Sequence, residues 1–287
     1  MTHDPAIAIM PYGLRFGAGY LDLSCDKLDW PLGQPDRLRG RPLRAMEKTD
    51  HLIVYPRPAL HVRPLFGLKA RLSMMVQEPR VIHNDHRKLL RVTWRRFFRV
   101  FSHDRDLVDH IPNGVFVPFG TTWVPDWRDL DLRKSKACSL IASAKRSQAG
   151  HEVRHSIADH VKARGLDVDV MGGGYAPFDR KSDGLAPYRY SVVIENSREP
   201  DYFTEKLVDA ILCLTVPIYW GCPNIGDYFD TSSFVICDSE GEIRDALERL
   251  SASDYEARRP GLEALRDSAA RFANLHLRTA EALRDSL

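Results

Sequence analysis

The sequence lacks the features of disulfide-rich, membrane-spanning and repetitive proteins. It has five cysteines, an odd number with no C-x-x-C spacing, which favours reduced core residues in a cytosolic protein over a disulfide framework. No apolar stretch approaches the roughly 18 residues of a transmembrane helix, and the run at 6–10 is too short for a signal peptide. We therefore expect a cytoplasmic protein that neither spans a membrane nor leaves the cell by the signal-peptide route.

A strong excess of one charge is also absent. The net charge is +2, which is too balanced to indicate bulk nucleic-acid binding, and no nucleic-acid recognition motif is present. A chain of 287 residues with 44% hydrophobic and 28% charged residues has the composition of a globular protein with a substantial core. We expect small-molecule and glycan partners and no nucleic acid.

Short apolar runs that alternate with amphipathic segments dominate the second half of the chain. This alternation predicts βαβ units, and hence a parallel sheet with helices on both faces. The expected strands are 138–142, 168–171, 190–194, 216–220 and 233–236, and the expected helices are 151–164, 204–213 and 240–250.

The first 130 residues show apolar runs separated by loops rich in proline and arginine. The expected strands are 6–10, 52–55, 72–76, 97–101 and 115–117, with a helix at 84–96. We predict an N-terminal α/β domain over residues 1–133, a C-terminal domain over 134–260, and a helix over 261–287 that packs on the domains. The predicted class is α/β, with two Rossmann-like domains that face each other across a cleft.

The most informative segment runs from residue 188 to residue 207. A buried strand ends in Glu195-Asn196-Ser197, and ligands of open α/β sheets bind outside the carboxyl ends of strands. Thr204-Glu205-Lys206 then opens a helix, and a cation in the first turn opposes the helix dipole unless an anion binds there. The alternative is that Lys206 extends to solvent while Glu205 caps the helix.

Three motifs in order carry a family resemblance. They are E-N-S at 195–197, D-Y-F-T-E-K at 201–206 and V-P-I-Y-W-G at 216–221. In this order and spacing the sequence resembles glycosyltransferase family 10, the α-1,3/4-fucosyltransferases, most clearly over residues 137–250. The resemblance implies a GT-B fold and transfer of L-fucose from GDP-β-L-fucose to a glycan hydroxyl with inversion.

The resemblance also implies a donor site. Lys206 and Arg154 match the lysine and the upstream arginine that neutralise the diphosphate, and Asn196, Tyr202 and Glu205 match positions that line the nucleotide-sugar pocket. Fixed cations aimed at a departing GDP stabilise the transition state, so these groups could act without a metal. The alternative for Arg154 is a surface position on its helix.

Inversion requires a general base, which this fold class takes from the N-terminal domain. We predict Glu78, because family members carry a glutamate shortly before a proline at a comparable place. Here the pattern is compressed to Glu78-Pro79, and an ordinary loop acid is the alternative. Glu47 and Asp85 are the fallback candidates.

Metal-binding and glycine-rich patterns are weak. The D-x-D pairs at 129–131 and 167–169 could bind a metal–diphosphate complex, but such spacing is common by chance, and we expect no essential metal or other cofactor. Gly173, the centre of a glycine triplet, is expected in a site-lining loop, with a flexible turn as the alternative.

Arginines and aromatic residues are interleaved between Arg87 and Arg99. This cluster could contact anionic lipid at the inner membrane face or a phosphorylated glycan acceptor, and a solvated helix face is the alternative. Because animal members of the family carry a membrane anchor that is not evident here, we expect a bacterial protein.

Two other functions stay open, namely the same fold with a different nucleotide-sugar donor and a non-catalytic nucleotide-sugar binding protein.

Overall fold

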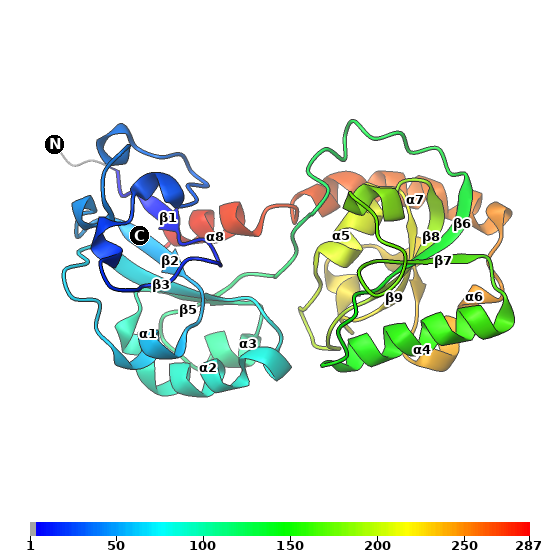
Figure 1. Cartoon of the computed structure of the whole chain (residues 1–287), viewed down its shortest axis with the longest axis horizontal. Coiled ribbons are helices and arrows are strands. Elements are labelled where there is room, and N and C mark those ends of the chain that lie inside the picture. Colours follow the sequence, from blue (N-terminus) through cyan, green and yellow to red (C-terminus); the bar gives the residue numbers. More distant parts are fainter. Residues whose placement is uncertain (1–3) are drawn as a thin grey trace. The chain divides into compact units, whose positions relative to one another are not determined.

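The structure, a computed structural model, describes residues 4–287 and divides the chain into two compact units. Unit 1 comprises residues 1–117 and 275–287, and unit 2 comprises residues 118–274. Each unit is built around its own five-stranded sheet in which all the strand pairings are parallel (Figure 1). The expected parallel α/β class is therefore observed. The division falls after Val117, earlier in the chain than the expected boundary at residue 133.

The strands of unit 1 follow one another across the sheet in chain order. They are β1 (Ile7–Ile9), β2 (His51–Val54), β3 (Arg71–Val76), β4 (Val100–Ser102) and β5 (Gly114–Phe116). The helices are α1 (Pro58–Val62), α2 (Arg80–Thr93), α3 (Arg105–Val108) and α8 (Leu275–Arg284). Right-handed crossovers that always advance in one direction place their helices on one face. Accordingly α1, α2 and α3 cover one face of the sheet, and α8 lies on the other (Figure 1).

The connection between β1 and β2 is long and contains four short 3₁₀ helices. They are η1 (Tyr20–Asp22), η2 (Cys25–Lys27), η3 (Asp36–Leu38) and η4 (Leu43–Ala45). The buried carboxylate of Asp50 orders this segment, because it accepts hydrogen bonds from the backbone N–H of Ala6 at 3.0 Å and from Arg37 at 2.9 Å. A buried charge is tolerated only with such partners.

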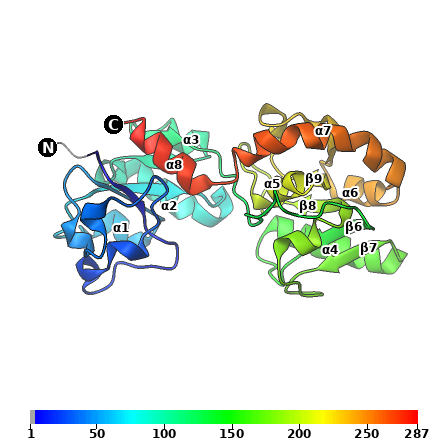
Figure 2. The same ribbon diagram turned by 90° about the horizontal axis from the view of Figure 1, so that it is seen from above.

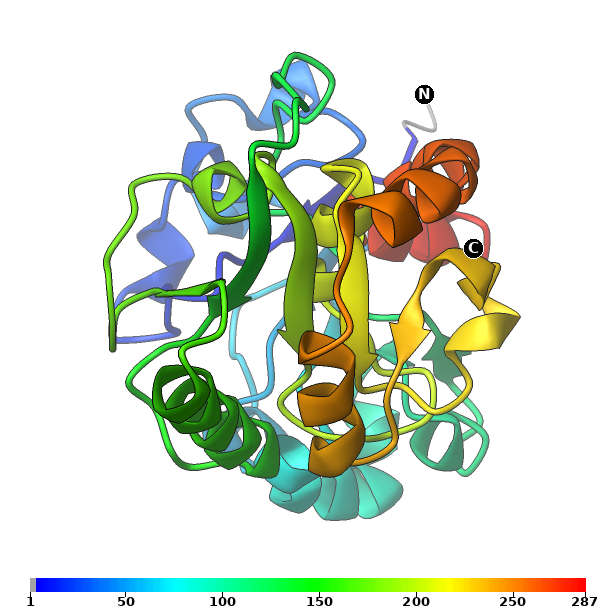
Figure 3. The ribbon, with the colours of Figure 1, turned by 90° about the vertical axis from the view of Figure 1, so that its right-hand side faces the viewer.

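The sheet of unit 2 changes direction at its centre. The strand order is β10 (Val235–Ile236), β9 (Val216–Trp220), β8 (Tyr188–Ile194), β6 (Lys136–Ile141) and β7 (Val168–Met171). The helices are α4 (Ala149–Arg164), α5 (Glu205–Leu212), α6 (Glu240–Leu247) and α7 (Ala252–Ala270). The chain places β7 on one side of β6 and then β8 on the other, so neighbouring crossovers leave the sheet on opposite faces. Helices α4 and α6 cover one face and α7 covers the other (Figures 2 and 3).

The end of the chain forms two helices instead of the single helix expected over residues 261–287. Helix α7 starts at Ala252, ends at Ala270 and belongs to unit 2, whereas α8 starts at Leu275 and belongs to unit 1. The Phe272 ring, just past α7, lies 5.1 Å from the Phe203 ring and 5.4 Å from the Phe229 ring. Contact of the half-buried Phe272 ring with these rings anchors the chain to unit 2 at the point where it leaves α7.

All five cysteines lie buried and unpaired in the cores of the two units. Within residues 4–287, no helix combines the length and the apolar character needed to cross a bilayer.

Candidate functional site

A pocket of about 230 Å³ opens in unit 2 beyond the carboxyl ends of β6 and β8. These two strands flank the position where the strand order reverses, and open α/β sheets bind their ligands at such a switch point. The pocket is lined by Ile141 at the end of β6 and Ile194 at the end of β8. Its polar lining consists of Ser143, Lys145, His151, Arg154, Lys181, Ser191, Asn196, Glu205 and Lys206.

Four of the residues predicted for the donor site line this one pocket: Arg154, Asn196, Glu205 and Lys206. Arg154 lies in the second turn of α4, Asn196 follows the end of β8, and Glu205 and Lys206 open α5. Arg154 and Lys206 are 52 positions apart in the chain. The fold therefore brings together side chains that the sequence separates.

Arg154 is held against the end of β8. Its Nε and Nη2 donate to the carbonyl oxygen of Ile194 at 3.1 and 2.9 Å, and Nη2 also donates to Oδ1 of Asn196 at 2.8 Å. The side chain is buried, which excludes the surface alternative considered from the sequence. Burial lowers the pKa of Arg154, while Glu195 and Glu205 favour its charged form.

Lys206 lies in the first turn of α5 with its ammonium among three oxygens. Nζ is 3.1 Å from Oγ1 of Thr204, 3.3 Å from Glu205 and 3.5 Å from Glu195. Burial disfavours the ammonium, but the attraction of Glu205 and Glu195 outweighs it, so the pKa of Lys206 is raised. Lys206 is therefore a fixed cation and does not extend freely to solvent.

Glu195 supports this arrangement and was not among the predicted site residues. Its carboxylate is fully buried and accepts hydrogen bonds from the N–H of Thr204 at 2.8 Å and from Oγ1 of Thr204 at 2.7 Å. Burial raises the pKa of Glu195, and the charge of Lys206 opposes that shift. The carboxylate thus ties the end of β8 to the start of α5. The sequence contained a signal for this role: Glu195 follows a strand, and Thr204 is the N-cap residue of the next helix.

Two further lysines bring positive charge to the pocket. Lys181 starts the 3₁₀ helix η6 (Lys181–Gly184), and its Nζ lies 5.5 Å from the centre of the Trp123 ring. Burial lowers the pKa of Lys181, and the charge of Glu205 opposes this. With Lys145 the lining contains four cationic side chains and one carboxylate. The excess of positive charge remains when buried Glu195 is included, so the pocket suits an anion.

His151 is a neutral polar group in the pocket wall. It is buried, and Nδ1 has no hydrogen-bond partner among the residues that the structure describes. Burial, followed by the nearby charge of Arg154, lowers the pKa of His151 to about 4. An unsatisfied buried nitrogen is costly unless a ligand or water completes it.

Trp123 lies in a segment that the sequence analysis assigned to the N-terminal domain. The Trp123 side chain lines the pocket and is 63% exposed. Asp209 holds the segment, because it accepts from the Trp123 N–H at 3.1 Å and from Oγ1 of Thr122 at 2.5 Å. Burial raises the pKa of Asp209 to about 7. No local pattern identifies this contact, since it joins positions 86 apart in the sequence.

Tyr202 and Gly173 do not line the pocket, although both were predicted to do so. Tyr202 is buried, with its ring 5.8 Å from the Phe119 ring. Gly173 is exposed, and a Cβ there would meet nothing within 4 Å. The constrained glycine is Gly172, which has φ of 111° and would bring a Cβ to 2.2 Å from the carbonyl oxygen of Ala142. The structure therefore assigns the triplet to a turn, which was the alternative interpretation.

The predicted base, Glu78, belongs to unit 1. It is half-buried and follows β3 by two positions, so it lies at the carboxyl edge of that sheet. The fallback Glu47 precedes β2 and lies at the opposite edge, and Asp85 is exposed on α2. Among the three acids, Glu78 alone has the position at which parallel sheets place their reactive groups.

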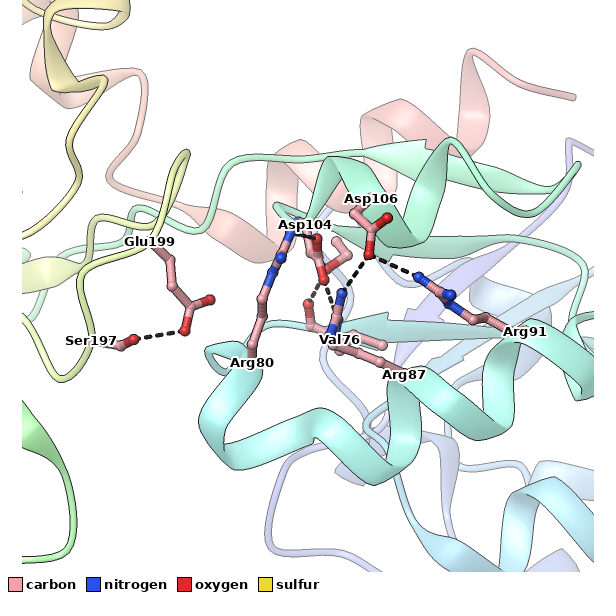
Figure 4. Close-up of polar contacts among 9 residues, drawn as sticks. Val76, Arg80, Arg87, Arg91, Asp104, Asp106, Ser197 and Glu199 are labelled. Atoms are coloured by element: carbon pink, nitrogen blue, oxygen red, sulfur yellow. Dashed lines mark hydrogen bonds and ion pairs between the residues drawn. The ribbon is translucent and has the colours of Figure 1, made fainter.

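The acidic pairs and the arginine cluster are engaged in local ion pairs. Asp131 pairs with Arg133 at 2.6 Å, and Asp169 pairs with Lys136 at 2.8 Å. In unit 1, Asp104 and Asp106 accept from Arg80, Arg87 and Arg91 (Figure 4). Part of the basic charge expected to face lipid is thereby neutralised within the unit, and the peripheral membrane contact through Arg87–Arg99 stays a prediction.

Comparison with known proteins relates unit 2 to one family. Residues 131–259 match the sequence model described as glycosyltransferase family 10 (fucosyltransferase), C-terminal part. The matched segment lies within unit 2. It contains the four predicted residues that line the pocket.

The relatives are known fucosyltransferases that match part of this chain. Alpha-(1,3)-fucosyltransferase FucT of Helicobacter pylori is 40% identical over 55 residues, which is 19% of this chain and 12% of that protein. Human 4-galactosyl-N-acetylglucosaminide 3-alpha-L-fucosyltransferase FUT6 is 27% identical over 152 residues, 50% of this chain and 41% of that protein. The chain thus spans less than half the length of these relatives.

The fold extends beyond the region of sequence similarity. The structure of Alr3699/HepE from Anabaena, in complex with UDP and glucose, matches with a TM-score of 0.56 at 11% identity, covering 85% of this chain and 79% of that one. The likeness covers elements of both units, and the chain has the GT-B fold.

Proposed function

We propose that this protein is an inverting glycosyltransferase that transfers L-fucose from GDP-β-L-fucose to a hydroxyl group of a glycan. The observation that carries the proposal is the meeting of Arg154 and Lys206 in one pocket at the switch point of the unit 2 sheet. The family model and the relatives named above, all described as fucosyltransferases, support the choice of donor.

The proposed step forms one bond and breaks another at the anomeric carbon of fucose. The acceptor oxygen attacks that carbon while the bond from the carbon to the diphosphate oxygen breaks, and the departing GDP takes the electron pair. Arg154, Lys206 and Lys181 face the negative charge that develops on the diphosphate. Cations fixed in this way are worth several kcal/mol in a pocket that excludes water.

The remaining roles are proposals of the same mechanism. The acceptor proton passes to the carboxylate of Glu78, which acts as general base. Asn196 is oriented by Arg154 through a hydrogen bond of 2.8 Å, and Glu205 offers its carboxylate to sugar or ribose hydroxyls.

Because side-chain cations supply the charge that a metal supplies elsewhere, we propose that transfer requires no divalent metal. The buried, unpaired cysteines suit a reducing, cytoplasmic location.

A different donor is the second candidate. The polar lining described above recognises a diphosphate, and no contact in it distinguishes fucose from another sugar. A non-catalytic nucleotide-sugar binding protein would use the same pocket without transfer. GDP-dependent thermal stabilisation without turnover of any donor would support that function.

The test is incubation of the full chain with GDP-fucose, other GDP- and UDP-sugars and a panel of glycans, with and without EDTA. We expect release of GDP and a fucosylated product with GDP-fucose alone among the donors, undiminished by EDTA. Transfer from another donor in preference to GDP-fucose would overturn the choice of sugar, and loss of activity in EDTA would overturn the metal-free mechanism.

Paired variants test the pocket itself. Lys206→Ala should abolish transfer, whereas Lys162→Ala removes an exposed lysine near the end of α4 and should not. Arg154→Lys keeps the charge but loses the double contact to Ile194, and should lower donor affinity at least ten-fold. Arg249→Lys, at an exposed arginine, is its control. Normal transfer by Lys206→Ala would remove the assigned diphosphate role.

A further inference from the structure

A second and larger pocket, of about 690 Å³, lies in unit 1 and has no role in the donor site. It is lined by Met10, which follows β1, and by Tyr55, which follows β2, so it opens at the carboxyl edge of this sheet as well. Its volume is in the range of pockets that take small-molecule ligands.

Aromatic rings build one part of the wall. Tyr12 and Tyr55 meet edge to face with ring centres 5.1 Å apart, and Phe16 and Tyr20 do the same at 5.3 Å. Tyr55 is buried, and its hydroxyl lies 2.6 Å from Nε2 of His276. Tyr55 is thereby fixed and supports the exposed Tyr12 ring, against which a flat apolar face can pack.

Arginines supply the charge of the pocket. Arg15, Arg57 and Arg63 line it, and the lining contains no aspartate or glutamate. Arg57 donates to the carbonyl oxygen of Tyr12 at 2.6 Å and lies 5.1 Å from the centre of its ring, which holds the guanidinium in place. Within residues 4–287 neither Arg15 nor Arg63 forms an ion pair with a carboxylate. Three positive charges thus face a cavity without a counter-charge in its wall.

We propose that this pocket binds an acidic saccharide, a sugar that carries a carboxylate or a phosphate group. Aromatic rings cover the apolar C–H face of a sugar ring, and the guanidinium fork matches a carboxylate or a phosphate with two parallel hydrogen bonds. A neutral sugar would use the rings and leave three arginines unpaired. The inference rests on the proposed function in one respect, since it makes the acidic saccharide the acceptor or a part of it.

Four probes test the chemistry on the full chain by ligand-observed NMR titration at low salt. They are D-glucuronic acid, glucose 6-phosphate, glucose and inorganic phosphate. We expect at least one of the two acidic sugars to bind ten-fold or more tightly than both glucose and phosphate, and to weaken as salt rises. Whichever acidic sugar binds more tightly identifies the recognised group as a carboxylate or a phosphate. Equal binding of glucose, or phosphate binding as tightly as the acidic sugars, would overturn the proposal.

A double variant locates the binding. Arg15→Gln with Arg63→Gln should weaken the acidic sugar at least ten-fold and leave glucose unchanged. The matched control is Arg39→Gln with Arg44→Gln, which removes two exposed arginines of the same unit outside the pocket. Equal effects of the two double variants would reduce the observation to general surface charge and overturn the assignment to this pocket.

GDP binding to the same samples separates this inference from the proposed function. GDP should bind the Arg15/Arg63 double variant as tightly as the wild type, because the donor pocket belongs to unit 2. If the wild type binds GDP but shows no preference for the acidic sugars, the acidic-saccharide inference alone is contradicted. Failure of the wild type to bind GDP contradicts the proposed function instead.

Discussion

Gly150 lies against the backbone of Glu195 so closely that a Cβ at residue 150 would sit 1.8 Å from the Glu195 carbonyl oxygen. The N–H of Gly150 also donates to the carbonyl oxygen of Asn196 at 3.2 Å. The first two turns of α4 carry His151 and Arg154, and this close approach packs the start of the helix directly against the chain that follows β8. The absence of a side chain at residue 150 is what permits this contact.

Gly150→Ala should separate α4 from β8. Overpacking of this kind costs about 1–3 kcal/mol, and the forced shift moves Arg154 away from Asn196, so we expect a lower melting temperature and at least ten-fold weaker GDP binding. Gly173→Ala is the control, because a Cβ there meets nothing and its backbone is not in the left-handed region. If Gly150→Ala and Gly173→Ala had the same stability and the same GDP affinity, the close approach of Gly150 to Glu195 would not contribute to GDP binding.

Glu195→Gln should destabilise the start of α5. Both bonds from Thr204 need an acceptor, and an amide offers one oxygen and one nitrogen donor in place of two oxygens. One buried donor is left without an acceptor, at a cost of about 1–3 kcal/mol. Urea unfolding measures the loss, and Glu152→Gln, at an exposed position on α4, should show none. A Glu195→Gln protein as stable as the control would contradict this role.

The affinity for GDP should rise as the pH falls from 7.5 to 5.5, and part of that rise should depend on His151. In the free protein the pKa of His151 is about 4, so the imidazole is neutral; a bound diphosphate favours the imidazolium and raises that pKa. Isothermal titration calorimetry at several pH values should give a steeper slope for the wild type than for His151→Asn. Protonation of GDP itself affects the slopes of both proteins equally, so the difference between the slopes reports on His151. His160→Asn, on the same helix, should keep the wild-type slope.

Asp209 should make stability fall as the pH rises. Its folded-state pKa is raised from 3.8 to about 7, so between these values the folded protein holds a proton that the unfolded chain has released. The contribution of Asp209 is therefore full below about pH 4 and is lost as the pH rises towards 7. The melting temperature of the wild type minus that of Asp209→Asn should decrease between pH 4.5 and 7.5. Asp245→Asn, at an exposed carboxylate, should show a constant difference, and an increasing difference for Asp209→Asn would contradict the sign.

Glu78→Gln tests the assignment of the base. If Glu78 accepts the acceptor proton, kcat should fall by about 10² or more, while the dissociation constant of GDP stays unchanged because Glu78 lies outside unit 2. Glu47→Gln and Asp85→Asn should retain activity within a few-fold of the wild type. A normal kcat in Glu78→Gln, or a large loss in either control, would move the base to another residue.

The sequence alone determined the parallel α/β class, most strand positions and four side chains that line the unit 2 pocket. Strands buried on both faces read as short apolar runs, and polar residues directly after them mark the carboxyl edge of the sheet. Both are local patterns. The family motifs indicated which residues at this edge belong to a site, namely Arg154, Asn196, Glu205 and Lys206. All four line the pocket.

Only the tertiary structure decided which distant groups share that pocket and where the units divide. Trp123 and Lys181 line the unit 2 pocket, Trp123 held by Asp209 and Lys181 carried by a 3₁₀ helix. Buried Glu195 supports the pocket from behind through its bonds to Thr204. The contact between Trp123 and Asp209 joins positions 86 apart in the chain, so no local pattern identifies it. Burial then shifts the pKa values of Lys181 and Glu195. Tyr202 is likewise kept out of the pocket lining by tertiary packing, because its side chain is buried in the core.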